Sequence, residues 1–334
     1  MRIVLDAMGT DARPVPDVAG GLQAAREYDV TVIFVGPRDN IERELDKNDT
    51  RNCRLEIVDA PEVIEMKDKP SAILKDKPRS SMHVGLQMVR DGLAEAFVTM
   101  GNTGAALAVA TLASLGRIPG IKRPALSAMY AVNGRKMIFL DMGATPDAKA
   151  EWLEQFALMG SIYAQTALSI TQPRIATLCN GEEEGKGNLL TRETYDRLSV
   201  SNLNYVGHIE PIEILQGKAD VVVVDGFVGN IFLKTFEGTI RYVTNVIREE
   251  IMAKPLYKLG AMLARGAFRG VRNRLDTSEI GGAPLLGVNG VVIVGHGSAD
   301  ARSVRSAIRQ AQLAVLGRTV SAIRNGIAMY QQAE

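Results

Sequence analysis

Short runs of β-branched residues alternate with longer helical patterns along most of this chain, and this alternation restricts the fold more than any other feature. In the first third, strand-like runs cover residues 3–5, 30–35, 55–58 and 96–99, and helical patterns cover residues 18–28, 40–47 and 81–89. Strands that alternate with helices predict a parallel sheet covered by helices on both faces.

The middle of the chain departs from this alternation. Asn133-Gly134 separates two apolar runs, residues 128–132 and 136–140, and predicts an antiparallel hairpin because both turn positions require positive φ. Beyond it we expect helices at 152–168 and 231–250, strands at 174–178, 221–224 and 290–294, and one long helix or two at 301–331. No linker interrupts the chain, so we expect one intertwined two-lobed domain over residues 1–334.

Charge and cysteine content exclude several classes of protein. The 39 basic and 38 acidic residues nearly cancel, which gives no global attraction to nucleic acid. Cys53 and Cys179 are distant in sequence and form no metal-ligand spacing, so we expect two reduced thiols in a cytoplasmic protein. No stretch reaches the ~20 apolar residues of a membrane-spanning helix, and the N-terminal apolar run is too short for a signal peptide.

Glycine-rich segments follow the predicted strands. They cover residues 6–11, 101–104, 141–144, 180–187 and 225–230, with Asn, Asp and Lys among the glycines. Because the carboxyl ends of parallel strands share one edge of a sheet, we expect these segments to form one composite phosphate-binding cleft. Each segment alone is more typical of a turn or a helix cap.

Other phosphate and hydrolase motifs do not match. Gly181 and Gly185 are too close for a P-loop, and Gly187 stands where that motif needs Ser or Thr. No strand leads into G-x-G-x-x-G, and no G-x-S-x-G is present. Of the three histidines, His296 has the best position for a functional role, because it follows the last predicted strand.

Taken together, the segments resemble the bacterial phosphate acyltransferase family of phospholipid synthesis. The shared motifs run in order over nearly the whole chain, including Asp6-Ala7-Met8-Gly9, Gly101-Asn102-Thr103-Gly104, Ile118-Pro119-Gly120-Ile121, Arg123-Pro124-Ala125, Gln155-Phe156-Ala157, Glu182-Glu183-Glu184-Gly185-Lys186-Gly187, Asp225-Gly226-Phe227-Val228-Gly229-Asn230, Leu233-Lys234-Thr235, Gly281-Gly282-Ala283-Pro284-Leu285-Leu286-Gly287 and His296-Gly297-Ser298. The sequence departs from the family pattern at Thr10, Thr145 and residues 207–211.

This resemblance implies a Rossmann-like α/β/α sandwich with a mostly parallel sheet, similar to phosphotransacetylases and isocitrate/isopropylmalate dehydrogenases. It implies a homodimer that transfers a fatty acyl group from acyl-[acyl carrier protein] to inorganic phosphate, without cofactor or metal. A membrane acyltransferase would then pass the acyl group to glycerol 3-phosphate.

Phosphate is already an anionic nucleophile near neutral pH, so it needs no strong general base. The enzyme must instead hold phosphate against the thioester carbonyl and stabilise the negative charge that develops on the carbonyl oxygen. We expect Lys186 to neutralise phosphate, and Asn230 and Asn102 to donate to the phosphate or the oxyanion. The remaining expected substrate contacts are Asp6, Gly9, Gly101, Thr103, Gly104, Asp141, Gly143, Asn180, Glu183, Asp225, Phe227, Lys234 and His296. A solvated loop lysine is the alternative interpretation of Lys186.

Residues 251–276 form a basic amphipathic segment with helical spacing. Its expected membrane contacts are Lys254, Leu256, Lys258, Leu259, Leu263, Arg265, Phe268 and Arg269, on the inner face of the cell membrane. Three glycines in the segment also allow two short helices or a hairpin. A helix packed on the dimer core and a dock for the acidic carrier protein are the alternatives.

Three other functions compete with this hypothesis. A phosphotransacetylase for short acyl-CoA needs similar phosphate contacts but has no use for the basic segment. A dehydrogenase of the isocitrate type needs an aspartate metal cluster and dicarboxylate-binding arginines, which we cannot assemble from this sequence. A non-catalytic membrane scaffold does not require the dense Gly, Asn and Lys segments.

Overall fold

An 11-stranded sheet runs through the whole molecule in the computed structural model, which describes residues 1–132, 135–275 and 281–333. The strand order is β3-β2-β1-β4-β11-β10-β5-β6-β9-β7-β8. The strands are β1 (Arg2–Asp6), β2 (Thr31–Gly36), β3 (Arg54–Asp59), β4 (Ala96–Thr99), β5 (Ala125–Val132), β6 (Arg135–Leu140), β7 (Ile175–Leu178), β8 (Tyr205–Ile209), β9 (Val221–Val223), β10 (Ala283–Leu286) and β11 (Val291–Val294). Most neighbours are parallel, which confirms the predicted fold class.

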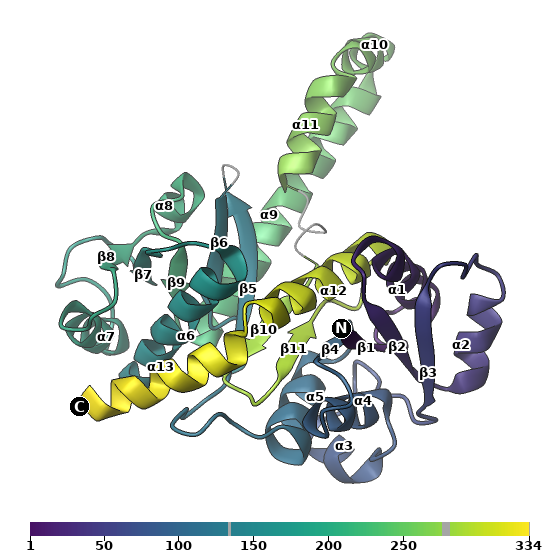
Figure 1. The fold of residues 1–334 in the computed structure, drawn as a ribbon. Helices are drawn as coiled ribbons and strands as arrows, with labels where there is room; N and C mark the ends of the chain where they lie inside the picture. The colour runs from purple at the N-terminus through teal and green to yellow at the C-terminus, as the bar shows by residue number, and fades with distance from the viewer. Residues whose placement is uncertain (133–134, 276–280, 334) are drawn as a thin grey trace.

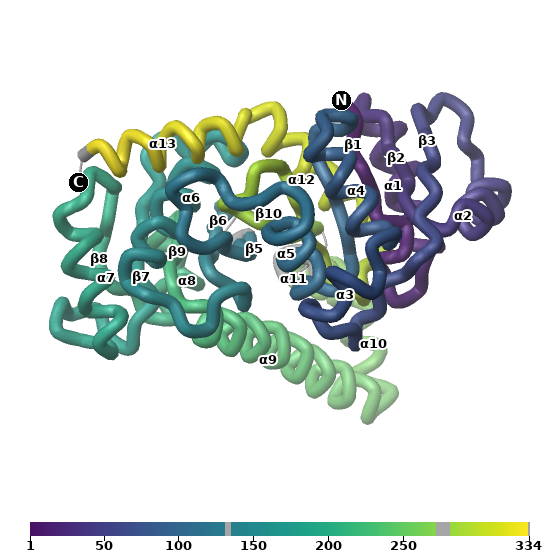
Figure 2. The backbone as a smooth tube through the Cα atoms, turned by 90° about the horizontal axis from the view of Figure 1, so that it is seen from below, coloured from purple at the N-terminus to yellow at the C-terminus, as the bar shows by residue number. Residues whose placement is uncertain are grey.

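Helices cover both faces of the sheet (Figures 1 and 2). They are α1 (Val15–Glu27), α2 (Arg38–Leu45), α3 (Pro70–Asp76), α4 (Ser81–Arg90), α5 (Thr103–Ala108) with the π-helical turn Val109–Ser114, α6 (Ala150–Leu168), α7 (Leu189–Ser199), α8 (Pro211–Gln216), α9 (Gly226–Ala253), α10 (Pro255–Leu263), α11 (Arg265–Leu275), α12 (Ala301–Leu316) and α13 (Thr319–Ala333). The central strands are buried on both faces, which explains their continuous runs of Val, Ile and Leu.

The strands form two lobes that share the last helices. β1–β4 and β11 build the amino-terminal lobe, and β6–β9 build the carboxyl-terminal lobe, with β10 and β5 between them. α12 packs on the first lobe and α13 packs on α6 of the second. The predicted range 301–331 is therefore two helices, one of the two forms that the sequence allowed.

The two lobes have opposite strand directions. β11 is parallel to β4 but antiparallel to β10, and two further antiparallel pairings lead through β5 to β6. The prediction that all five glycine-rich segments meet at one edge of a parallel sheet is therefore wrong. The segments after β1 and β4 form one group, joined by the loop after β11, and the segments after β6, β7 and β9 form a second group.

Two strands were not predicted from the sequence. β10 contains Pro284, which lacks a ladder N–H, and β8 contains Gly207 at φ +97°. The strands of the predicted hairpin are observed as β5 and β6, whereas its turn, Asn133-Gly134, lies outside the described residues.

A helical arm projects from the body of the protein. α9 runs away from the sheet for 28 residues, α10 packs against it, and α11 follows α10 within the arm (Figure 1). The basic segment 251–276 thus forms the end of α9 and two short helices; Asp276 lies outside the described residues. Within the described part of the chain, no helix has the length and apolar character needed to cross a bilayer.

Candidate active site

Asp6 organises the group of segments in the amino-terminal lobe. Its side chain is buried at the end of β1 and accepts hydrogen bonds from the Met8 N–H (3.0 Å) and the Thr99 hydroxyl (2.7 Å). Thr99 Oγ1 in turn accepts from the Gly101 N–H at 3.0 Å. Burial raises the pKa of Asp6. The Gly101 N–H, one of the expected phosphate donors, is therefore engaged within the protein.

Close packing explains two of the predicted glycines. A Cβ atom on Gly9 would lie 2.6 Å from the Met100 nitrogen, and one on Gly101 would lie 2.6 Å from the Met82 methyl carbon. Gly9 is required for the close approach of the β1 segment to the β4 backbone, whereas a side chain at Gly101 would displace the flexible end of Met82. Gly104 packs similarly against Pro70, and Thr103 is exposed at the start of α5.

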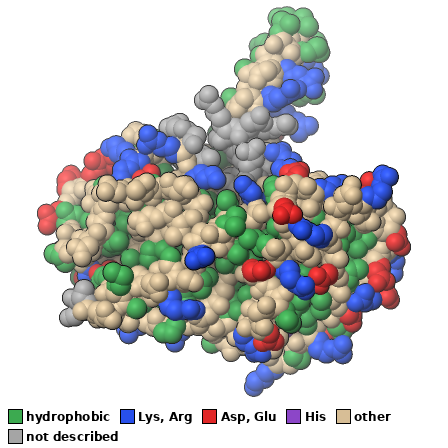
Figure 3. Space-filling view, in the orientation of Figure 1, with side chains coloured by type: hydrophobic (Ala, Val, Ile, Leu, Met, Phe, Trp, Pro, Cys, Tyr) green, Lys and Arg blue, Asp and Glu red, His purple; other side chains and the backbone are tan. Residues whose placement is uncertain are grey.

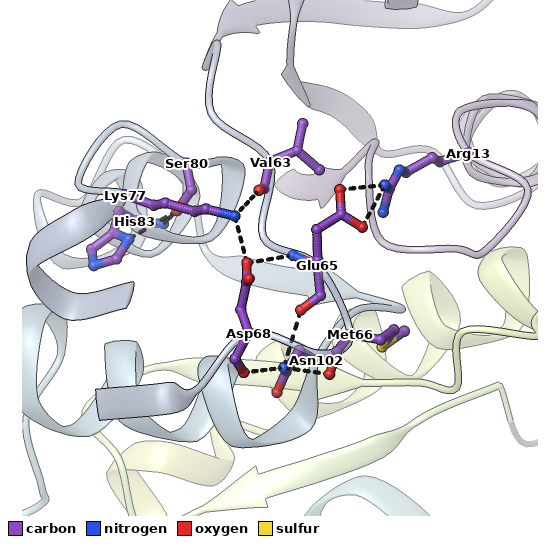
Figure 4. Close-up of polar contacts among 9 residues, drawn as sticks. All are labelled: Arg13, Val63, Glu65, Met66, Asp68, Lys77, Ser80, His83 and Asn102. Atoms are coloured by element: carbon purple, nitrogen blue, oxygen red, sulfur yellow. Dashed lines mark hydrogen bonds and ion pairs between the residues drawn. The ribbon is translucent and has the colours of Figure 1, made fainter. Parts of the chain in front are cut away.

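Asn102 joins the β4 segment to the loop that precedes α3. Its Oδ1 accepts from the Ala105 N–H (3.0 Å) and caps α5. Its Nδ2 donates to the carbonyl oxygens of Glu65, Met66 and Asp68 at 3.1–3.2 Å, as Figure 4 shows. Both the oxygen and the nitrogen of this amide thus form hydrogen bonds within the protein. In this arrangement the Asn102 side chain offers no donor to a substrate.

Two ion pairs stabilise the loop of residues 65–68 that Asn102 binds. The Arg13 guanidinium donates to both carboxylate oxygens of Glu65, at 2.7 and 2.8 Å. Lys77 pairs with Asp68 and also donates to a backbone carbonyl (Figure 4). These contacts lower the pKa of Glu65 and of Asp68, in each case chiefly through the hydrogen bond from the cation. No sequence motif indicated this network.

Thr10, a departure from the family pattern, has a partner inside the lobe. Its hydroxyl and its N–H both donate to the fully buried carboxyl group of Asp17 in α1. Burial raises the pKa of Asp17 to about 8, with the nearby Asp6 carboxyl adding to the shift. His296, expected to contact substrate, is exposed and bonds locally to Ser298 Oγ at 2.8 Å.

Asp141 organises the second group of segments, in the carboxyl-terminal lobe. It follows β6, is fully buried, and accepts from the backbone N–H groups of Leu126 (2.9 Å), Ala144 (3.3 Å) and Thr145 (2.6 Å). Burial raises the pKa of Asp141 to about 6, and these hydrogen bonds oppose the shift. The contact at Thr145 comes from the backbone, so it does not depend on the side chain that departs from the family pattern.

The start of α9 packs directly on the Asp141 segment. Asp225 caps the helix by accepting from the Phe227 and Val228 N–H groups at 3.0 Å. A side chain on Gly229 would collide with the Asp141 carbonyl oxygen. Asn230 lies against Gly143, since a Cβ on that glycine would be 3.6 Å from Asn230 Nδ2. The predicted residues Asp141, Gly143, Asp225 and Asn230 therefore lie together.

The loop after β7 carries Lys186. Its Nζ lies 4.0 Å from Glu183 Oε2, and about half of the Lys186 side chain is exposed. The aliphatic stem covers Gly181, where a Cβ would lie 2.8 Å from Lys186 Cγ. Asn180 is exposed and accepts a weak bond from the Cys179 thiol. β6, β9 and β7 are adjacent and parallel. The loop that carries Lys186 therefore begins at the same edge of the sheet as the segment that carries Asp141.

The remaining predicted contacts are on the surface of α9. Phe227 is 61% exposed in its first turn, and Lys234 is exposed one turn beyond Asn230. The edge formed by β6, β9 and β7 thus carries the Asn230 amide, the exposed Phe227 ring and glycine backbone next to the Asp141 segment, and the loop with Lys186 starts from the same edge. Such an edge can hold an anion and a carbonyl oxygen, as acyl transfer to phosphate requires.

The fold is shared with a phosphotransacetylase and with a dehydrogenase of known structure. A phosphotransacetylase from Streptococcus pyogenes is similar over 97% of this chain and 94% of its own, with TM-score 0.58 and 17% identity. A 4-hydroxythreonine-4-phosphate dehydrogenase from Klebsiella pneumoniae is similar over 93% and 98%, with TM-score 0.51 and 13% identity. These likenesses confirm the predicted fold.

Residues 1–321 match the family described as fatty acid synthesis protein, and the chain belongs to that family. A relative from Pelotomaculum thermopropionicum, named phosphate acyltransferase, is 44% identical over 327 residues, covering 98% of this chain and 95% of the relative. Another of the same name, from Acidobacterium capsulatum, is 45% identical over 311 residues, covering 92% of each. The resemblance found in the motifs is confirmed.

Proposed function

We propose that this acyltransferase moves a fatty acyl group from acyl-[acyl carrier protein] to inorganic phosphate, reversibly, to give an acyl-phosphate. A phosphate oxygen attacks the thioester carbonyl carbon; the C–O bond forms, the C–S bond breaks, and the carrier thiolate leaves and takes up a proton. The observation that carries the proposal is the β6–β9–β7 edge, where Asn230 lies against Gly143 and Lys186 leaves the neighbouring strand.

Three groups divide the work at this edge. Lys186 balances the charge of phosphate, and Asn230 donates from Nδ2 to the developing oxyanion, beside backbone that has no side chain at Gly143. Asp141 acts as a positioning residue, because its carboxyl group orders three N–H groups of the surrounding segment. In the other lobe, Asn102 and Asp6 support the fold of the β4 and β1 segments.

The helical arm favours a long-chain acyltransferase over a short-chain phosphotransacetylase. Large apolar side chains are exposed on α10 and α11, among them Leu256 (73%), Leu263 (86%) and Phe268 (42%). Figure 3 shows such side chains at the tip of the arm, with Lys and Arg below them. This combination suits contact with an anionic membrane, where a membrane glycerol-3-phosphate acyltransferase would take up the product.

A second apolar surface lies on α9 itself. Tyr242, Val243, Val246 and Ile247 recur at helical spacing and are 39–70% exposed. A stripe of this kind is normally covered by a partner, and a second copy of the arm would supply one. We therefore propose a homodimer that works in the cytoplasm and lies peripherally on the inner face of the cell membrane.

The test is to incubate the purified protein with palmitoyl-[acyl carrier protein] and phosphate and to follow release of the carrier thiol. Phosphate-dependent release with acyl-phosphate as product is expected. If palmitoyl-[acyl carrier protein] is inert while acetyl-CoA and phosphate react, the protein is a phosphotransacetylase and the proposal is refuted.

A further inference from the structure

Trp152, the single tryptophan of the chain, has two cations at its ring. The Arg123 guanidinium carbon lies 5.0 Å from the ring centroid and Lys149 Nζ lies 5.6 Å from it. The two charges are therefore no farther apart than the sum of these distances, about 11 Å. The indole N–H donates to Glu151 at 3.0 Å, which helps to orient the ring.

Neither cation is neutralised within the described residues. Arg123 and Lys149 are both exposed, and no ion pair to either is present in that part of the chain. Contact with an aromatic face stabilises a cation but leaves its charge in place. The ring thus holds two exposed positive charges within about 11 Å of each other, and both are available to an anion.

The cation pair lies at the edge that carries the candidate active site. Arg123 precedes β5 by two residues, and β5 pairs antiparallel with β6, so the start of β5 adjoins the end of β6. Leu126, which donates to Asp141, is three residues away, at most about 11 Å along the chain. Lys149 is four residues beyond Thr145, which also donates to Asp141, at most about 14 Å away.

We infer that Arg123 and Lys149, held on Trp152, bind the phosphate of the pantetheine arm that presents the acyl thioester. This inference rests on the proposed function, since it assumes a carrier-bound thioester as substrate. The arm carries its thioester at one end and its phosphate at the other, so an anion site is needed at a distance from the reacting carbonyl. The exposed cations Arg123 and Lys149, at the border of this edge, meet that need.

The experiment compares two small thioesters, palmitoyl-4′-phosphopantetheine and palmitoyl-pantetheine, as acyl donors to phosphate. The variants are Arg123→Gln and Lys149→Gln. Each is expected to raise KM for the phosphorylated donor about 10-fold, the effect of losing one hydrogen bond to a charged group. KM for palmitoyl-pantetheine should not change. Lys122→Gln removes a neighbouring exposed charge without a ring contact and is the matched control.

Several outcomes would overturn the inference. Equal effects on both donors would show that the cations do not recognise the donor phosphate, and a rise in KM for inorganic phosphate alone would assign the pair to the nucleophile. An effect confined to acyl-[acyl carrier protein], absent with the free phosphorylated arm, would place the contact on the acidic protein surface. If the unaltered protein uses neither donor nor the acylated carrier protein, the proposed function itself fails.

Discussion

Asn102 offers the sharpest test of how the amino-terminal lobe supports the site. Its amide caps α5 and also binds three carbonyl oxygens of residues 65–68. Loss of a helix cap costs about 1 kcal/mol. Loss of the two amide N–H donors, which bind partly buried and exposed carbonyls, adds about 1–3 kcal/mol at about 0.5–1.5 kcal/mol for each hydrogen bond. Asn102→Ala should therefore lower the free energy of unfolding by roughly 2–4 kcal/mol.

Two further variants separate the helix cap from the hydrogen bonds that Asn102 donates to residues 65–68. Asn188→Ala removes a cap of the same type from α7, where the side chain accepts from the Thr191 N–H at 2.9 Å, and should cost only about 1 kcal/mol. Asn102→Asp keeps the acceptor for Ala105 but places a carboxylate against the carbonyl oxygens, and should destabilise at least as much as Asn102→Ala.

The assay is equilibrium unfolding in urea, with limited proteolysis to report local opening of residues 62–69. The reasoning is refuted if Asn102→Asp unfolds at the same urea concentration as the unaltered protein, or if the loop stays protected in both Asn102 variants. A fall in turnover without any opening of the loop would instead assign Asn102 the direct donor role that the motif suggested.

Lys186→Ala and Asn230→Ala should each reduce turnover ~100- to 1,000-fold while leaving the urea midpoint unchanged, because removal of one well-placed donor costs that much; a near-normal rate in a folded variant removes that residue from the mechanism. Charge reversal at both Lys258 and Arg265 should weaken sedimentation with anionic vesicles but not with neutral ones. Unchanged binding would show that this part of the arm does not contact the membrane. Because the pKa of Asp17 is raised to about 8 in the folded protein, ionisation opposes folding and stability falls as pH rises from about 4 to 8. Asp17→Asn cannot ionise, so its stability relative to the unaltered protein should increase across that range, and a difference independent of pH would contradict the assignment.

Local features of this protein could be predicted from the sequence alone. Buried strands such as β1 and β9 read as β-branched runs because both faces of the sheet are covered. The basic apolar spacing of residues 251–276 predicted exposed amphipathic helices, and α10 and α11 have that character. The motifs also indicated the family, since they occur in the same order over nearly the whole chain.

The arrangement of these elements required the tertiary structure. Strand direction depends on the pairing of β10 with β5, which joins residues about 160 positions apart, and no local pattern encodes such a pairing. The partners of Asn102 come from a loop without a motif, and Arg123 and Lys149 meet on Trp152 only after β5 and α6 have packed. Residue types within a short window therefore determined the elements and the chemistry available, whereas long-range packing decided which of those groups face one another.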